Sequence, residues 1–553
     1  MNFMNYKTRF INKKFWYGAA SFLIAAGRAV SLKFYGATTA SFPGKLNAVI
    51  VLLRTLVYTA VFFAVLCGAD RLLDNRKITS RLFVRDGEKK GTWWEGYAAL
   101  AAGWLPLLLI KYPAALCWDS WSMIYEYRNK CYTEHQSVYY EVIMGRLIEL
   151  GKRVGHTNWG LFAFSVLHYV ILVAAFGYSL QILRKMNISR KCRWAVTLIY
   201  LLNPYIAGYV GVIIKDFPYA VFMLILFLCM VEIYLDSAAF SRNPLKLAVL
   251  FISVVNIYLI RKNGSYIVFG CAVLLAIRTL RKKLPKRPVV VMIAALAVSA
   301  AVFGMLGTHF HAVKGSVKEA LSLPFQQTAR YVKVYGDEVT EEEKAAIDAV
   351  LPYDELARKY KPRISDPIKN MYKEDGSKLP AYFKVWFRQF LKHPLCYVSA
   401  TWEQNYYLFV PEVDNIVLYQ DIDTGYELQN VVYMPERWNY SAIFGTRAGS
   451  ETLKQWIIQE LNLLHRIPGV RLLGNISFWF YLLLFVTVLS FVRRTDDLLL
   501  LALLYFSVLF VLLGPVIQGH PRYMFPVIYA MPVMLLFMIA GQVHGENKTP
   551  DRR

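Results

Sequence analysis

Charged residues are scarce in this sequence of 553 residues, where Asp, Glu, Lys and Arg together make up 18%. Soluble domains carry about a quarter charged residues, whereas hydrophobic residues here reach 56% and form many long runs. A run of about 20 apolar residues suffices to cross a bilayer. We therefore expect a polytopic membrane protein rather than a soluble globule.

Acidic residues are especially few, because 38 Asp and Glu stand against 63 Lys and Arg, which gives a net charge of +25. A basic excess of this size can indicate nucleic-acid binding. Much of it, however, lies in short loops between apolar runs. That distribution is the positive-inside pattern, which sets membrane topology, so membrane lipids rather than nucleic acid are the expected partners.

Cysteine is also rare, with seven residues and neither a CxxC motif nor the Cys/His spacing of a metal site. Cys117 and Cys131 share one predicted outer loop and could pair. Free thiols are the favoured interpretation, since nothing else in the chain resembles a disulfide framework. The sequence shows no internal repeat, low-complexity tract or cleavable signal, so its first apolar stretch is expected to be an uncleaved span.

The apolar runs predict a mainly α-helical bundle of about twelve spans. The predicted spans are 15–36, 48–68, 97–116, 159–181, 192–213, 217–236, 247–260, 263–278, 289–307, 472–492, 497–517 and 522–541. If they alternate, the Lys/Arg-rich loops 71–90, 183–193, 278–287 and 493–497 share one side, which we predict to be cytoplasmic together with both termini. Joining 247–278 into one span would place the basic 278–287 loop outside, so two short spans are predicted there.

This topology divides the chain into five predicted parts. They are 1–96 (two spans and a basic loop), 97–307 (a membrane module with outer loop 117–158), 308–470 (a soluble, α-rich outer domain), 471–541 (three spans) and 542–553 (a cytoplasmic tail).

Three helices are predicted outside the spans. In the first outer loop, apolar residues at helical spacing from Tyr139 to Leu150 lie beside a polar stripe of Glu141, Gly145, Glu149 and Lys152. This pattern predicts an amphipathic helix lying on the outer leaflet. In the outer domain, Thr340 and Glu343 form a capping box that opens a helix, and a further helix is predicted over 379–392.

Polar residues gather at the predicted outer ends of the spans. Asp119 follows the third span, between Trp118 and Trp121. The other candidates are Lys215 and Asp216, Arg261, Lys262 and Asn263, His520 and Arg522, and, at the start of the outer domain, Gln326, Gln327 and Arg330. Ionisable residues at the membrane are costly and are usually functional.

The chemistry of these residues suits a lipid-linked phosphate. An Arg fork binds a phosphate through two parallel hydrogen bonds and Lys acts as a point charge, and both stabilise a departing phosphate. Asp119 can accept the proton of an attacking hydroxyl as a general base. The two tryptophans could offer an apolar platform for a sugar or an isoprenoid.

Each residue also has a simpler interpretation. Trp118 and Trp121 fit an interfacial aromatic belt, Arg261 and Arg522 could snorkel to lipid headgroups, and Lys215 with Asp216 could stabilise a turn. Glu134 and His135 could complete a metal site with Asp119, although three candidate ligands in one loop are common by accident. No cofactor is assigned, and the use of Mg²⁺ or Mn²⁺ is left open.

The ordered motifs "CWDSW", "HQSVYYEVIMGRLIEL", "IIKDFPYA", "IRKNGSY", "PFQQTARYV" and "GHPRYMFP" resemble the GT-C superfamily of polytopic glycosyltransferases, in a bacterial branch. The resemblance covers about 97–541. It implies inverting transfer of a sugar from a polyprenyl-phosphate or pyrophosphate carrier to an envelope glycan or lipid, outside the bacterial plasma membrane. It assigns Asp119 as the base and Lys215, Arg261 and Arg522 to the carrier phosphate. Two departures are the two extra N-terminal spans and Ser120, which stands where many members carry a second acid.

Two other functions are left open. A polysaccharide polymerase or ligase acting on a lipid pyrophosphate would depend on Arg and His rather than on an acidic base. A transporter or flippase for lipid-linked sugars would place its site near the bilayer midplane, often in repeats. Since the polar residues lie at one boundary and no repeat is visible, the enzyme is favoured.

Overall fold

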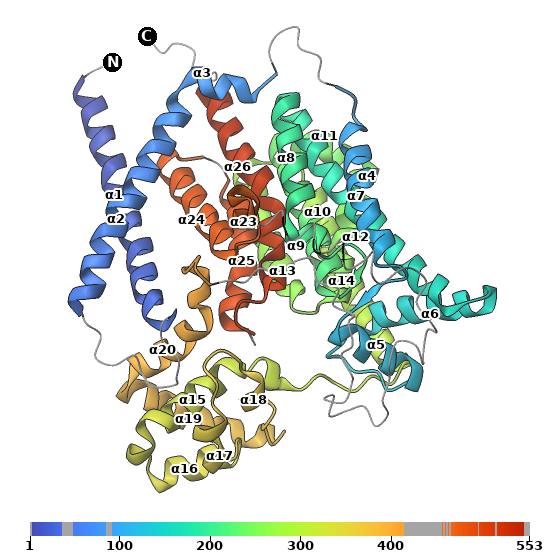
Figure 1. The fold of residues 1–553 in the computed structure, drawn as a ribbon, viewed down its shortest axis with the longest axis vertical. Coiled ribbons are helices and arrows are strands. Elements are labelled where there is room, and N and C mark those ends of the chain that lie inside the picture. The colour runs from blue at the N-terminus through green and yellow to red at the C-terminus, as the bar shows by residue number, and fades with distance from the viewer. Residues whose placement is uncertain are drawn as a thin grey trace.

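The computed structural model describes residues 3–35, 48–84, 91–413, 456, 459, 463, 466–495, 497–514 and 517–546. Within these residues the protein is mainly α-helical, and its only sheet is a pair of two-residue strands. Figure 1 shows long helices side by side, with the start of α1 (Phe3–Tyr35) and the end of α26 (Phe525–Glu546) at one end of the bundle and a group of short helices at the other.

Eight of the helices are long and apolar enough to cross a membrane. They are α1 (Phe3–Tyr35), α2 (Ala48–Asp74), α7 (Thr157–Lys185), α10 (Asp216–Leu235), α13 (Gly264–Lys282), α14 (Arg287–His309), α24 (Ile476–Arg493) and α26 (Phe525–Glu546). Three further apolar helices are shorter: α4 (Glu95–Ile110), α12 (Pro244–Ile260) and α25 (Leu498–Leu513). The predicted mainly α-helical, polytopic membrane fold is confirmed.

The helical structure is interrupted at Arg261–Asn263, between α12 and α13, as the separate spans 247–260 and 263–278 predict. The predicted span 192–213 is wrong at its end, because α8 (Arg190–Leu202) stops before it. Asn203 accepts a hydrogen bond from Tyr205 N at 2.9 Å, and Pro204 starts the short α9 (Pro204–Ala207). Proline at the first helical position suits a new helix but cannot continue an old one.

A buried strand pair joins the ends of two of these segments. β1 (Ala115–Leu116) runs parallel to β2 (Val212–Ile213), with Ala115 opposite Val212. The carboxyl ends of parallel strands lie at the same edge. The residues that follow β1 and β2 therefore emerge side by side.

Helix α10 lies at the centre of the bundle, where it packs against α7, α12 and α26. The helices approach closely at glycines: a Cβ on Gly96 of α4 would lie 2.5 Å from Leu180, and one on Gly177 of α7 would lie 2.1 Å from Tyr97. Small residues allow this approach between membrane helices, where van der Waals packing replaces the hydrophobic drive.

The loop 117–158 folds into α5 (Trp118–Asn129), which the sequence did not predict, and α6 (Val138–Val154), which it did. The predicted polar stripe of α6 is wrong in its first half, because Glu141 and Gly145 are buried against the protein. The missing side chain of Gly145 leaves room for the Tyr127 ring of α5, since a Cβ there would lie 2.3 Å from it.

A second set of helices has its own apolar core, which contains Phe325, Ile347, Leu356 and Tyr382. It comprises α15 (Ser322–Tyr335), α16 (Glu341–Asp348), α17 (Tyr353–Lys359), α18 (Asp366–Lys369), α19 (Leu379–Lys392) and α20 (Pro394–Asn405). The predicted capping box of Thr340 and Glu343 is confirmed, as is the helix over 379–392. Most of 414–465 lies outside the described residues, and the domain boundaries and the side of the membrane remain predictions.

All seven cysteines lie in the described ranges and are free, which confirms the favoured interpretation. Cys117 is buried at the start of α5, while Cys131 is exposed just beyond its end. The buried thiol of Cys117 lies 3.3 Å from Ser120 Oγ. It therefore belongs to the packing around β1 rather than to a covalent crosslink.

Candidate functional site

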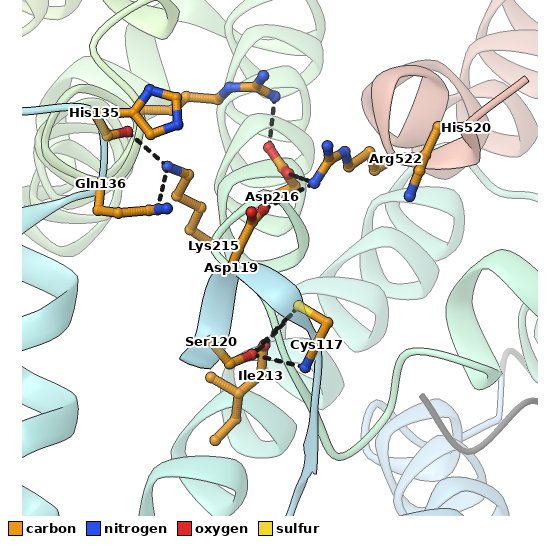
Figure 2. A network of polar contacts seen from close by, with 11 residues as sticks. Cys117, Asp119, Ser120, His135, Gln136, Ile213, Lys215, Asp216, His520 and Arg522 are labelled. Carbon is orange, nitrogen blue, oxygen red and sulfur yellow. Dashed lines mark hydrogen bonds and ion pairs between the residues drawn. The ribbon is translucent and has the colours of Figure 1, made fainter. Parts of the chain in front are cut away.

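The strand pair brings Asp119 beside Lys215 and Asp216, which follow β1 and β2 respectively. The turn after β1 is held by Ser120, which is fully buried. Its Oγ accepts a hydrogen bond from Cys117 N at 3.0 Å and donates one to the Ile213 carbonyl of β2 (Figure 2). The Ser120 hydroxyl thus fastens the two strand ends together.

Two acids and two arginines form one ionic cluster at this edge (Figure 2). Arg522 Nη1 lies 2.9 Å from Asp119 Oδ2 and 3.3 Å from Asp216 Oδ2. Arg261 Nη1 lies 2.6 Å from Asp216 Oδ1. The four side chains come from α5, the first residue of α10, the C-cap of α12 and η8 (Pro521–Met524). Segments far apart in the sequence therefore converge, as the prediction of a common site requires.

The two carboxylates differ in their access to solvent. The Asp216 side chain is 3% exposed and contacts both arginines. The Asp119 side chain is 21% exposed and, among the residues that the structure describes, forms its ion pair with Arg522 alone. A buried acid with two cationic partners is a fixed counter-charge. Asp119, by contrast, can be reached by an incoming ligand and can exchange its partner.

Lys215 is the cation of the site that forms no ion pair within the described residues. Its Nζ donates to the backbone carbonyl of His135 at 2.8 Å and to Gln136 Oε1 at 2.6 Å. An ammonium has three donors, so these two neutral acceptors leave one donor for a ligand. Burial lowers the pKa of Lys215, although Asp119 and Asp216 oppose this change.

The acid Glu141 does not neutralise Lys215 at neutral pH. It is fully buried on α6. Burial, followed by repulsion from Glu126, raises the pKa of Glu141 to about 9. The carboxyl is therefore protonated near pH 7, and the positive charge of Lys215 remains available.

His520, one of the candidates at the outer ends of the spans, contributes no charge to the site at neutral pH. Burial, followed by the charge of Arg522, lowers the pKa of His520 to about 4. Its Nδ1 accepts a hydrogen bond from Arg522 N at 3.5 Å, which leaves Nε2 as the protonated nitrogen. His520 thus positions the Arg522 backbone and can act only as a neutral donor.

Four further candidates lie beside the cluster. Lys262 Nζ lies 3.4 Å from Glu134 Oε2, and both this lysine and Asn263 are exposed. The His135 carbonyl binds Lys215, while burial, followed by Lys215 itself, lowers the pKa of the His135 ring. Within the described residues no three His, Cys, Asp or Glu side chains are grouped to hold a metal ion, so the metal site suggested for Asp119, Glu134 and His135 is not assembled.

The candidates from the start of the outer domain do not join the cluster. Gln326 Nε2 donates to the Lys361 carbonyl at 2.9 Å, and Gln327 Oε1 accepts from Trp386 Nε1 at 3.1 Å. Arg330 is fully buried and forms an ion pair with Glu403. All three therefore connect α15 with its neighbouring segments, which is a structural role.

Trp118 and Trp121 flank Asp119 in the sequence. The Trp118 side chain lies outside the described residues. Trp121 is 6% exposed and belongs to the main hydrophobic core. It is thus placed neither as an open sugar platform nor as part of a belt facing lipid.

Sequence reasoning missed Ser120 and Gln136 as parts of the site. In the sequence, Ser120 stands out only as a departure from a family motif, and Gln136 only as a member of the motif "HQSVYYEVIMGRLIEL". A serine three residues after a cysteine has no distinctive signal, because the hydrogen bond to Ile213 depends on strand pairing. Gln136 adjoins the candidates Glu134 and His135, and this position was the one available clue.

One protein family, described as a family of unknown function (DUF6020), matches residues 127–552. The match includes Lys215, Asp216, Arg261 and Arg522, whereas Asp119 precedes it. A crystal structure of ArnT from Cupriavidus metallidurans bound to undecaprenyl phosphate is similar at 12% identity, with a TM-score of 0.30. That similarity covers 81% of this chain and 76% of ArnT. Among curated proteins, none matches this chain.

Proposed function

Because this chain belongs to DUF6020, a family of unknown function, we propose its activity from the geometry of its own site. We propose that it is a membrane glycosyltransferase of the GT-C kind. It transfers a sugar from a polyprenyl-phosphate carrier to an envelope glycan or lipid on the outer side of a bacterial plasma membrane. The observation that carries the proposal is the partly exposed Asp119 carboxylate held against Arg522, beside Lys215 and Arg261.

The balance of charge at the site favours an anionic ligand. Three cations, Lys215, Arg261 and Arg522, face two carboxylates, Asp119 and Asp216, which leaves one positive charge in excess. A site with excess positive charge, next to the ends of apolar helices, suits the phosphate of a membrane-anchored donor. The third donor of Lys215 and the guanidinium of Arg522 are the groups that would bind it.

The reaction follows from these positions. An acceptor hydroxyl attacks the anomeric carbon of the sugar and forms the new glycosidic bond, while Asp119 takes its proton. The bond between the anomeric carbon and the carrier phosphate breaks, and its electron pair leaves with the phosphate. Lys215 and Arg522 stabilise the negative charge that develops there. Attack opposite the leaving group inverts the anomeric configuration.

The resting site also implies an order of events. Asp119 and the donor phosphate compete for Arg522. Of the two carboxylates that contact Arg522, Asp119 is more exposed than Asp216. Phosphate binding to Arg522 therefore displaces Asp119, while Asp216 stays bound through Arg261. Donor binding thus frees the Asp119 carboxylate from Arg522, so that it can accept the proton of the acceptor hydroxyl.

Mass spectrometry of envelope glycans tests the proposal in cells that carry or lack the protein. The protein should be required for one sugar modification, and Asp119→Asn should abolish it while the variant remains folded in the membrane. Asp354→Asn is the matched control, because this aspartate is 86% exposed on α17 and lies in a separate ion pair. Unchanged glycans without the protein, or full modification by Asp119→Asn, would refute the proposal.

A further inference from the structure

Helix α19 carries apolar residues on two opposite sides. On one side, Tyr382 and Val385 are buried in the apolar core of its own set of helices. On the other side, Phe387 is 53% exposed and Leu391 is 64% exposed. At about 3.6 residues per turn, Leu391 lies directly opposite Tyr382 around the helix. A helix with apolar residues all round is normally covered on every side, so the outward side of α19 requires an occupant.

The outward apolar side continues along α20, which follows α19 after His393. Leu395 is 71% exposed and Val398 is 51% exposed. Together with Trp402 they recur at intervals of three and four residues, so all three lie along one side of α20. Trp402 Nε1 donates a hydrogen bond to Ser31 Oγ of α1 at 3.0 Å, and Figure 1 shows α20 at the end of α1. The apolar side of α20 therefore meets a helix of the membrane bundle.

The contact with α1 gives the depth of this side of α20. The apolar part of α1 that is long enough to cross a membrane ends at Tyr35. Ser31 precedes Tyr35 by four residues, which is about 6 Å along the helix. Trp402 therefore lies close to the end of a span, where tryptophan is enriched among the lipid headgroups. The exposed residues that extend from this level, called here the α19–α20 stripe, are Phe387, Leu391, Leu395 and Val398.

The charged residues of α19 are all basic, since its sequence contains no Asp or Glu. Lys384 and Arg388 lie on the outward side next to the stripe, and neither forms an ion pair within the part of the chain that the structure describes. Lys392, the third cation, lies 4.0 Å from Glu343 Oε1. A second copy of the chain seated on the stripe about a two-fold axis would bring like charges together. An anionic occupant with an apolar interior suits the stripe better.

We infer that α19 and α20 dock on the membrane surface, with the α19–α20 stripe among the lipid chains and with Lys384 and Arg388 at anionic headgroups. Helices that combine Phe and Leu with Lys and Arg bind in the plane of the interface, and anionic lipids strengthen their binding. Docking holds the helices α15 to α20 against the leaflet next to the bundle. This inference is independent of the proposed transferase reaction.

Spin labelling of the full-length protein in lipid vesicles tests the inference. A nitroxide is attached at Leu391→Cys or Val398→Cys, both exposed positions whose replacement leaves the core intact. The background removes the cysteines that are not buried, through Cys67→Ser, Cys131→Ser and Cys192→Ser. In vesicles that contain phosphatidylglycerol, dissolved oxygen should relax these labels more strongly than a water-soluble nickel chelate does. Asp354→Cys is the matched control, because this side chain is 86% exposed on α17, and there the nickel chelate should act more strongly.

The contribution of charge is measured with the label at Leu391→Cys. Lys384→Gln and Arg388→Gln should each lower the ratio of inserted to water-facing label about fivefold, the usual effect of one cation near an anionic surface. Vesicles of phosphatidylcholine alone should lower the same ratio, and an unchanged ratio would overturn the assignment to anionic lipid. Equal access of the nickel chelate to Leu391→Cys and Asp354→Cys would overturn docking altogether. Poor access of both reagents to Leu391→Cys would overturn it too, because protein would then cover the stripe.

Discussion

Arg522 and Asp119 form an ion pair at 2.9 Å although 403 residues separate them in the chain. Asp119 is placed by the parallel pairing of β1 with β2, and Arg522 by the turn before α26. Neither segment positions the other locally, so the pair forms only when the C-terminal helix packs into the bundle. The proposed site therefore depends on the whole membrane module.

Asp119→Asn should separate donor binding from transfer. The amide keeps the shape of the side chain but no longer holds Arg522 by charge, so farnesyl phosphate, a short polyprenyl-phosphate probe, should bind at least as tightly as to the wild type. Sugar transfer should fall by about 10² to 10⁴, the usual contribution of a general base. Calorimetric titration and glycan analysis measure the two effects. If the protein were instead a polymerase or ligase that depends on arginine, the Asp119→Asn variant would transfer sugar at the wild-type rate.

Asp216→Asn should lower the stability of the protein. Asp216 is 3% exposed and contacts Arg261 and Arg522, and removing one partner of a buried ion pair destabilises a protein by about 3 kcal/mol. Thermal unfolding in detergent compares this variant with the control Asp354→Asn. An Asp216→Asn variant as stable as the wild type would show that Asp216 is not a fixed counter-charge for the two arginines.

Probe binding should weaken at alkaline pH because of Lys215. Burial lowers the pKa of Lys215 from its ordinary value of 10.5. Its cationic form, which binds phosphate, is complete below the lowered pKa and is lost as pH rises through it. Phosphate itself is already doubly ionised above a pKa of about 6, so the decline reports on the protein. Lys215→Arg should bind farnesyl phosphate up to a higher pH. Identical profiles for the two proteins would contradict this assignment.

Arg330→Gln should destabilise the protein without changing the site. Arg330 is fully buried against Glu403 and donates to Tyr360 at 3.2 Å, so its loss leaves a buried carboxylate unpaired and costs about 3 kcal/mol. Thermal unfolding should shift downward, whereas the affinity of the folded protein for farnesyl phosphate should not change. Weaker binding of farnesyl phosphate by the folded Arg330→Gln variant would contradict this, because it would show that Arg330 contributes to ligand binding.

The sequence predicted the elements of the fold whose signal is local. Long apolar runs and basic loops indicated the spans, and Thr340 with Glu343 indicated a helix start that the structure confirms. The sequence also predicted the interruption of the helix at Arg261, because a single span there would have placed a basic loop on the opposite side from the other basic loops.

What the sequence could not predict depends on contacts between distant segments. Two-residue strands have no periodicity, so β1 and β2 were read as the ends of spans. The buried face of α6 was misassigned because Gly145 accommodates Tyr127 of another helix. Similarly, Arg330 seemed to belong with the other outer cations until its partner Glu403, 73 residues away, was located.

A cryo-electron microscopy structure with bound polyprenyl phosphate tests the central claim most directly. The phosphate should lie within hydrogen-bonding distance of Lys215 and Arg522, with Asp119 released from Arg522 and Asp216 still paired with Arg261. A phosphate bound elsewhere on the protein, with the Asp119–Arg522 pair intact, would contradict it.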